Sequence, residues 1–341
     1  MSAPVHPATR AVPDGQLRLI TKVARMYHER GIRQVDIAET LHLSQARVSR
    51  LLKRATELGI VRTVVLVPHA IHTGLEEALE ERYGLAEVVV VEVEGGDADI
   101  LAGLGSAGAT YLESTLTGGE RVGISPWSQT LLAVVERMRP LRLAGAEDVV
   151  QLIGGLGAHS AQARANRLLG DLAQLLGASA TFVAAPGLVA NRGVRDSLLG
   201  EPAMQAISRE WDALTMCLVG IGSLPPSEFL RASGNAVGEE DQAALLAAGA
   251  VGDVCHRFFD AAGAPVSTAL DERVVGISAD ALRAVPRRIG ISGGPSKQEA
   301  VRAAVTGGWV NVLVTDIGTA HRLLEEPAGR LESPGPTPPR S

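Results

Sequence analysis

Residues 31–59 read GIRQVDIAETLHLSQARVSRLLKRATELG, and this stretch decides how the N-terminal part of the chain folds. Apolar residues at helical spacing predict a short helix from Val35 to Leu41 and a second helix from Val48 to Leu58. Between them, His42-Leu43-Ser44 predicts a turn, with Ser44 as the N-cap of the second helix. Gly59 predicts where that helix stops. Two helices joined by a short turn predict a helix-turn-helix.

The polar face of the second predicted helix is basic, which indicates a nucleic-acid surface. In a helix-turn-helix this helix lies in the DNA major groove, where its early residues reach base edges and its later ones reach phosphates. The candidate DNA-contacting residues are Arg33, Ser44, Gln45, Arg47, Ser49, Arg50, Lys53 and Arg54. The alternative is an ordinary amphipathic helical hairpin with a solvated basic face.

The charge distribution favours the DNA-binding interpretation. Residues 16–62 hold ten lysines and arginines against four acidic residues, whereas the whole chain has a net charge of −6. A basic head on an acidic body is the asymmetry expected when one domain meets double-stranded DNA.

Composition narrows the remaining function classes. Aromatic residues make up only 3% of the 341 residues, so an aromatic platform for single-stranded nucleic acid is not expected. Cys217 and Cys255 are the two cysteines and both lie in apolar surroundings, which predicts buried thiols and neither a disulfide framework nor a metal site. No apolar run approaches 18 residues and the N-terminus lacks a signal-peptide pattern, so we expect a soluble cytoplasmic protein without a membrane partner.

Along the chain, four segments are expected. Residues 1–13 are predicted to be disordered, and residues 14–67 to form the helix-turn-helix domain, with a first helix packed behind the other two and a strand over 60–67. Residues 68–326 alternate apolar strands with helices, which predicts an α/β domain with a mostly parallel sheet. The stretch AVGDVCHRFF is read as one of its strands. Residues 327–341 form a Pro-rich tail, predicted to be disordered.

Ligands of such sheets lie beyond the carboxyl ends of the strands, and four stretches occupy that position. In residues 123–130, hydroxyls and free N–H groups suit an anion, although simple N-capping by Ser125 or Ser128 explains them equally well. Residues 151–155 offer Gln151 and two glycines. Residues 290–297 end in Lys297, one of three lysines in the chain, at the start of a helix, where a bound anion would explain it. The alternative is an ordinary surface lysine. Residues 315–319 hold Asp316, which caps the last helix and also faces the site.

Motifs of known enzyme classes are missing from the sequence. No glycine cluster has the spacing of a phosphate-binding Walker A loop or of a dinucleotide-binding fingerprint, and no histidine pair has metal-ligand spacing. We therefore expect no cofactor, no metal and no catalytic residues. Arg257 follows an apolar strand and could pair with a phosphate or with a carboxylate of the fold, and Asp260 lies near a turn at Gly263.

The whole pattern resembles the SorC/DeoR-type sugar-responsive bacterial transcriptional regulators. The resemblance spans about Leu17 to Leu324 and rests on SRLLKRATELGIVRTVV, VVQLIGG, GDVCHRFFDAAGAPV and, most specifically, RRIGISGGPSKQEAVRAAVTGGWVNVLVTDIGTAHRLL. It implies a C-terminal effector domain similar to the ribose-5-phosphate isomerase and glucosamine-6-phosphate deaminase folds, which binds a phosphorylated sugar without turnover. It also implies a homo-oligomer, either a dimer or a tetramer, on operator DNA.

By this resemblance, Lys297 and the loop from Ser125 to Thr130 would contact the phosphate or the sugar, and Arg257 and Asp260 would lie near the ring. Together with the residues singled out above, the candidate effector-binding set is Ser125, Trp127, Ser128, Gln129, Thr130, Gln151, Gly154, Gly155, Arg257, Asp260, Gly293, Gly294, Lys297 and Asp316. The alternative function is a sugar-phosphate isomerase or deaminase with a fused DNA-binding head, for which Asp260 or Asp316 would have to serve as the general base.

Overall fold

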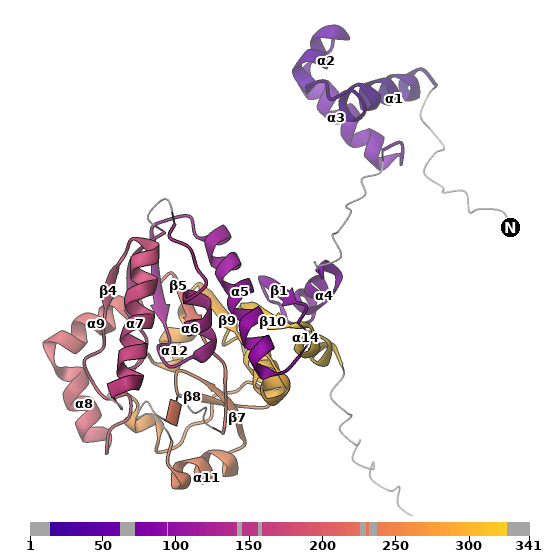
Figure 1. Ribbon diagram of the computed structural model, residues 1–341. Helices are drawn as coiled ribbons and strands as arrows, with labels where there is room; N and C mark the ends of the chain where they lie inside the picture. Colours follow the sequence, from indigo (N-terminus) through magenta and orange to yellow (C-terminus); the bar gives the residue numbers. More distant parts are fainter. Residues whose placement is uncertain are drawn as a thin grey trace, which may run out of the picture. The chain divides into compact units, whose positions relative to one another are not determined.

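The computed structural model describes residues 14–61, 72–93, 95–141, 145–155, 159–225, 230–231 and 237–325. The chain divides into two compact units between Val67 and Pro68, drawn in Figure 1, and each is described by itself. The ends predicted to be disordered, over 1–13 and 327–341, lie outside the described residues, as does most of the strand predicted over 60–67.

The N-terminal unit is a three-helix helix-turn-helix, as predicted. Its helices are α1 (Asp14–His28), α2 (Gln34–Thr40) and α3 (Gln45–Glu57). The hydroxyl of Ser44 accepts a hydrogen bond from the backbone N–H of Arg47 at 3.3 Å, which confirms the predicted N-cap of α3. Gly59 has a φ of 69°, and the N–H of Ile60 donates to the Ala55 carbonyl at 2.9 Å, so the helix ends in a left-handed glycine cap.

A small apolar core holds the three helices together. Its buried members are Ile20, Val23, Ala24, Met26, Ile37, Ala38, Val48, Leu51, Leu52 and Ala55. Leu43, in the turn, is partly buried against this core. The prediction that Val35 belongs to the apolar stripe is wrong: Val35 is 45% exposed, because it lies two residues before the buried Ile37 and so on another side of the helix. Ile60 and Val61 lie outside any strand and also pack on this core.

The larger unit is built on a seven-stranded sheet whose order is β1-β10-β9-β5-β2-β3-β4. The strands are β1 (Glu87–Val91), β2 (Glu120–Ile124), β3 (Ala146–Gln151), β4 (Ser179–Thr181), β5 (Met216–Val219), β9 (Arg287–Ile291) and β10 (Val312–Asp316). All neighbouring strands pair in parallel, which confirms the predicted α/β class.

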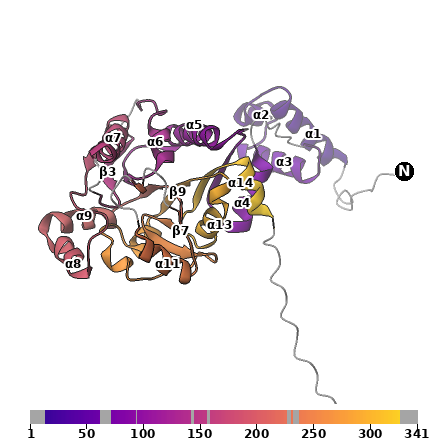
Figure 2. The same cartoon turned by 60° about the horizontal axis from the view of Figure 1, so that its bottom comes forward.

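Helices cover both faces of this sheet, as Figure 2 shows. One face carries α5 (Asp97–Thr115), α6 (Gln129–Val135) and α7 (His159–Leu176). The other carries α4 (Thr73–Tyr83), α9 (Pro202–Asp212), α12 (Ala279–Ala284), α13 (Gln298–Thr306) and α14 (Ile317–Leu324). Strand β5 alternates between the two cores: Met216 and Leu218 pack toward α5–α7, and Cys217 and Val219 toward the other helices. Burial on both sides explains why these strands are continuous apolar runs.

A separate three-stranded antiparallel sheet adjoins the carboxyl end of β5. It contains β6 (Gly222–Ser223), β7 (Ala250–Val254) and β8 (Arg257–Asp260). The single strand predicted over AVGDVCHRFF is therefore wrong: it is a hairpin whose two-residue turn is Cys255-His256. The apolar run concealed this turn because neither residue is a glycine, an asparagine or an aspartate, the usual residues of such turns.

The larger unit contains four further described elements. They are α8 (Arg192–Gly200), α11 (Glu239–Ala247) and the short 3-10 helices η2 (Asp271–Arg273) and η3 (Pro295–Lys297). Within the described residues, no helix has the length and apolar character needed to cross a membrane.

Gly263 provides a test of how closely β8 packs on α13. A β-carbon at Gly263 would lie 2.4 Å from the Ala303 carbonyl oxygen, and the residue has a φ of 77°. Gly249 has a similar φ of 80°, but a β-carbon there would meet nothing within 4 Å. We predict that Gly249→Ala costs about 1–2 kcal/mol of unfolding free energy through the backbone alone. Gly263→Ala should cost about 1–3 kcal/mol more through the clash. Denaturant unfolding followed by tryptophan fluorescence measures the unfolding free energy of both variants. Equal losses of unfolding free energy in the two variants would contradict the close packing at Gly263.

Candidate functional site

A cavity of about 560 Å³ lies at the carboxyl ends of the central strands, where sheets of this class bind ligands. Most of its described lining residues come from five groups: the loop after β2, residues 220–225 after β5, the loop after β9, the β7–β8 hairpin and the first turns of α5. The polar lining residues are Asp97, Ser125, Ser128, Gln129, Thr130, Ser223, Asp253, Cys255, His256, Ser296 and Lys297, and Trp127, Ile153, Gly293 and Gly294 are among the others.

The loop between β2 and α6 brings five predicted residues to the cavity: Ser125, Trp127, Ser128, Gln129 and Thr130. The hydroxyl of Ser128 accepts the backbone N–H of Leu131 at 3.2 Å, so the capping role considered for this residue is confirmed. The indole N–H of Trp127 donates to the Gly154 carbonyl at 3.0 Å and fixes the loop against the end of β3.

The loop between β9 and α13 contributes Gly293, Gly294 and Lys297, also as predicted. Gly294 has a φ of 91°, a conformation that favours glycine. Lys297 ends η3 and is half-buried; burial lowers the pKa of its amino group, and the carboxylate of Asp253 opposes that shift. Within the described part of the chain, the amino group of Lys297 has no hydrogen-bond or ion-pair partner. It is thus an available cation in the cavity wall.

Asp316 caps α14, as predicted, but does not line the cavity among the described residues. Its carboxylate accepts hydrogen bonds from the backbone N–H of Gly294 at 2.7 Å and from the backbone N–H of Thr319 at 2.9 Å. The Thr319 hydroxyl donates to it as well, at 2.7 Å. The side chain thereby holds the lysine-bearing loop in place.

The β7–β8 hairpin supplies three lining residues that the sequence did not reveal: Asp253, Cys255 and His256. Cys255 and His256 have φ values of 53° and 59°, which cost about 1–3 kcal/mol each for residues other than glycine. The N–H of His256 donates to the Asp253 carboxylate at 3.0 Å and pins the turn. The sequence signal that could have indicated this turn is Asp253, because an aspartate side chain often accepts a hydrogen bond from a nearby backbone N–H in a turn.

Five further predicted effector residues lie outside the cavity lining. Gly154 and Gly155 are buried at the end of β3, and the Gln151 amide donates to the Ile153 carbonyl at 2.7 Å and accepts from the Val183 N–H. Asp260 accepts the N–H groups of Ala262 and Ala264, both at 2.9 Å, and so shapes a turn.

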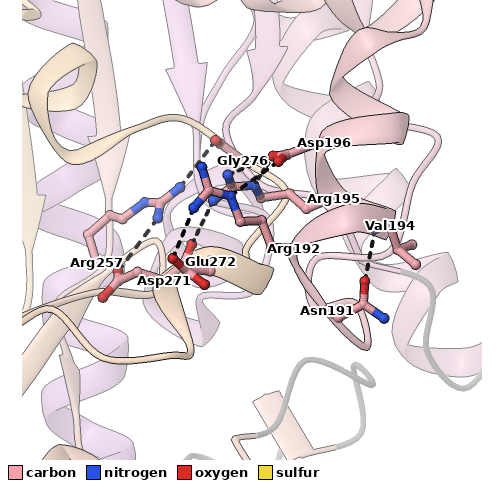
Figure 3. Close-up of polar contacts among 9 residues, drawn as sticks. All are labelled: Asn191, Arg192, Val194, Arg195, Asp196, Arg257, Asp271, Glu272 and Gly276. Atoms are coloured by element: carbon pink, nitrogen blue, oxygen red, sulfur yellow. Dashed lines mark hydrogen bonds and ion pairs between the residues drawn. The ribbon is translucent and has the colours of Figure 1, made fainter.

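Arg257 is the fifth, and Figure 3 shows its surroundings. Its guanidinium donates to the Ile277 carbonyl at 2.9 Å and lies 3.7 Å from the Asp271 carboxylate. Burial lowers its pKa, and Asp271 opposes the shift. Of the two partners considered for Arg257, a phosphate or a carboxylate of the fold, the structure shows the carboxylate.

The predicted DNA-contacting residues are all exposed, on α3 and at the ends of α2 and α3. Arg33 pairs with Asp36 at 2.9 Å, and Arg54 with Glu57 at 2.8 Å. Among the described residues, Arg50 donates to the Ala46 carbonyl of its own helix, at 3.3 Å, and has no acidic partner. Helix α3 therefore exposes Arg47, Arg50, Lys53 and Arg54 to solvent.

Metal coordination finds no support in the side chains that are described. Among them, no group of three or more histidines, cysteines, aspartates or glutamates could hold a metal ion.

Comparisons with known proteins agree with this architecture. Residues 69–325 match the model of the Sugar-bind family, whose description is that of a sugar-binding domain. The chain is 33% identical to the sorbitol operon regulator of Klebsiella pneumoniae over 313 residues, 91% of this chain and 98% of the relative. It is also 33% identical to the deoxyribonucleoside regulator of Bacillus subtilis, over 91% of this chain and 98% of that one.

Among solved structures, the full-length regulator SorC from Klebsiella pneumoniae is similar, with a TM-score of 0.67 and 30% identity. The similarity covers 92% of this chain and 100% of that one, so it includes both units.

The cavity thiol provides a test of the site. Burial raises the pKa of Cys255 to about 12, although the hydroxyl of Ser125 hydrogen-bonds the thiol and opposes the shift. Burial raises the pKa of Cys217 as well. We predict that neither thiol reacts with a disulfide reagent at pH 8 in the folded protein. In guanidinium chloride both thiols should react, because an unfolded cysteine has a pKa of about 8.5. Rapid reaction of one thiol per chain in native buffer would contradict this environment.

Proposed function

Because the chain belongs to the SorC/DeoR family of sugar-binding transcriptional regulators, we propose that a phosphorylated sugar or related carbohydrate binds in the cavity beside Lys297. Occupancy of the cavity then changes the affinity of α3 for operator DNA. The chain is thus a sugar-responsive transcriptional regulator, and the cavity is its input.

The observation that carries the proposal is the position of Lys297. It is the one lysine or arginine among the described lining residues, and no acid of the described residues lies within ion-pair distance of it. A partly buried ammonium group without a partner gains most from an anion, and a phosphate supplies one. The hydroxyls of Ser125, Thr130 and Ser223 surround the same space and suit a polyhydroxylated ligand.

The enzyme alternative finds no support in these contacts. Asp260 and Asp316, the carboxylates considered as general bases, are occupied by backbone hydrogen bonds and lie outside the described lining. The relatives that match nearly the whole chain are named as regulators.

Coupling between a sugar and DNA requires a ligand that binds two states unequally. We propose that these states differ in how two or four copies of the chain assemble. Paired α3 helices would then read half-sites about one helical turn apart, roughly 34–36 Å. Such a regulator works in the cytoplasm, where it meets DNA.

Arg50 tests the DNA-contacting surface. We predict that Arg50→Ala weakens binding by about 1–3 kcal/mol, roughly 5- to 150-fold, because an arginine contact to base edges is lost. Fluorescence anisotropy with a duplex selected from random-sequence DNA by the wild-type protein measures the change. Arg167→Ala, which removes an exposed arginine of α7, is the matched control and should bind normally. Equal affinities of the Arg50 and Arg167 variants would overturn this assignment of α3.

Lys297 tests the cavity. A sugar phosphate that binds only the folded state raises the melting temperature, so a thermal-shift screen of sugar phosphates identifies candidate effectors. We predict that Lys297→Ala weakens such a ligand by about 2–5 kcal/mol and so removes the shift, whereas DNA affinity without ligand is unchanged. Lys53→Ala, on α3, should instead weaken DNA binding and leave the thermal shift unchanged. An undiminished shift in Lys297→Ala would refute the phosphate role.

A further inference from the structure

Helix α8 is attached to the rest of its unit with little apolar burial. No residue of this fully described helix is buried, and Val194 is 42% exposed. Leu198 and Leu199 are only partly buried against the core. The polar contacts of its first turn, drawn in Figure 3, therefore carry much of the attachment.

Two of those contacts reach η2, whose three consecutive residues Asp271, Glu272 and Arg273 are here called the η2 triplet. The guanidinium of Arg195 donates to the Asp271 carbonyl at 3.3 Å, and Arg192 pairs with Glu272 at 3.4 Å. Arg273 pairs with Asp241 at the start of α11. Each member of the triplet thus holds a peripheral helix.

The triplet is also tied to the cavity. The carboxylate of Asp271 lies 3.7 Å from the guanidinium of Arg257, which is the first residue after the Cys255-His256 turn. That turn lines the cavity, and both of its residues hold positive φ values. The guanidinium of Arg257 also donates to the carbonyls of Gly276 and Ile277, at 3.3 and 2.9 Å, which fixes it to the segment that follows the triplet.

A turn of this kind is suited to two conformations. Asparagine and glycine adopt positive φ without strain, whereas cysteine and histidine do so only when their surroundings impose it. The cavity forms part of those surroundings, so a change in the cavity alters the forces on the turn. Arg257 is covalently next to the turn, and its guanidinium contacts Asp271 and the carbonyls of Gly276 and Ile277. A shift of the turn therefore changes these contacts.

We propose that Arg257 and the η2 triplet form a mechanical link that transmits the state of the cavity to helix α8. In this proposal the Cys255-His256 turn responds to the cavity, Asp271 and Glu272 pass that change to α8 through their contacts, and the order of α8 changes as a result. The proposal rests on the proposed function only in taking the cavity as the effector site. Arg257 is a positioning residue, since it lies outside the cavity lining.

Hydrogen exchange of the full-length protein, followed by mass spectrometry without sugar or DNA, tests the link. His256→Gly relieves the strained turn, and the exchange rate of α8 amides should change roughly 2- to 30-fold. In an Arg257→Lys background, which cannot make the same set of bonds, His256→Gly should leave α8 unchanged. His42→Gly is the matched control, because His42 also has a positive φ, 52°, but lies in the helix-turn-helix. It should not affect α8.

Two results would overturn the proposal: unchanged α8 exchange in His256→Gly, or the same change in both backgrounds. A merely structural role of Arg257 would loosen α8 in Arg257→Lys without removing the response to His256→Gly. If Arg257→Lys does not fold, Asp271→Asn provides the second background with the same criteria. Because the test uses neither ligand, failure of the sugar-binding proposal would appear separately, in the thermal-shift screen.

Discussion

The carboxylate of Asp316 is the contact on which the cavity depends. It gathers the N–H groups of Gly294 and Thr319 and the Thr319 hydroxyl, and so joins the carboxyl ends of β9 and β10. A β-carbon at Gly293 would lie 2.1 Å from this carboxylate, so only glycine permits the approach. These hydrogen bonds offset the cost of burying the Asp316 carboxylate. The same contact begins α14 and sets the path of the chain into η3, which places Lys297 in the cavity wall.

Much of this fold could be predicted from the sequence because its signals are local. Continuous apolar runs that end in glycine indicate strands buried on both faces, and residues 287–291 and 312–316 are such strands. Ser44 and Gly59 mark the ends of α3 because capping depends on the residues next to the helix end. The loops after β2 and β9 reach the cavity because parallel strands bring their carboxyl ends to one edge.

The predicted effector residues that lie outside the described cavity lining have partners distant in sequence. Arg257 and Gln151 are polar residues near strand ends, as ligand-binding residues are, but Asp271 and Val183 occupy them. Nothing local distinguishes these two uses of a side chain. The hairpin at Cys255-His256 was missed because its positive φ values are imposed by tertiary packing and not by turn-forming residues. For this reason the sequence did not predict Asp253 and His256 as cavity-lining residues.

In the proposed regulator, α3 contacts DNA and the cavity beside Lys297 binds the sugar phosphate. Thermodynamic linkage requires that the sugar phosphate changes the affinity for DNA by the same factor by which DNA changes the affinity for the sugar phosphate. One coupling free energy governs both binding equilibria. The most direct measurement is a paired titration of DNA affinity with and without a stabilising sugar phosphate, and of sugar-phosphate affinity with and without the selected duplex. We expect both affinities to change by the same factor, about 5- to 150-fold. A sugar phosphate that binds the protein and leaves its affinity for DNA unchanged would contradict it.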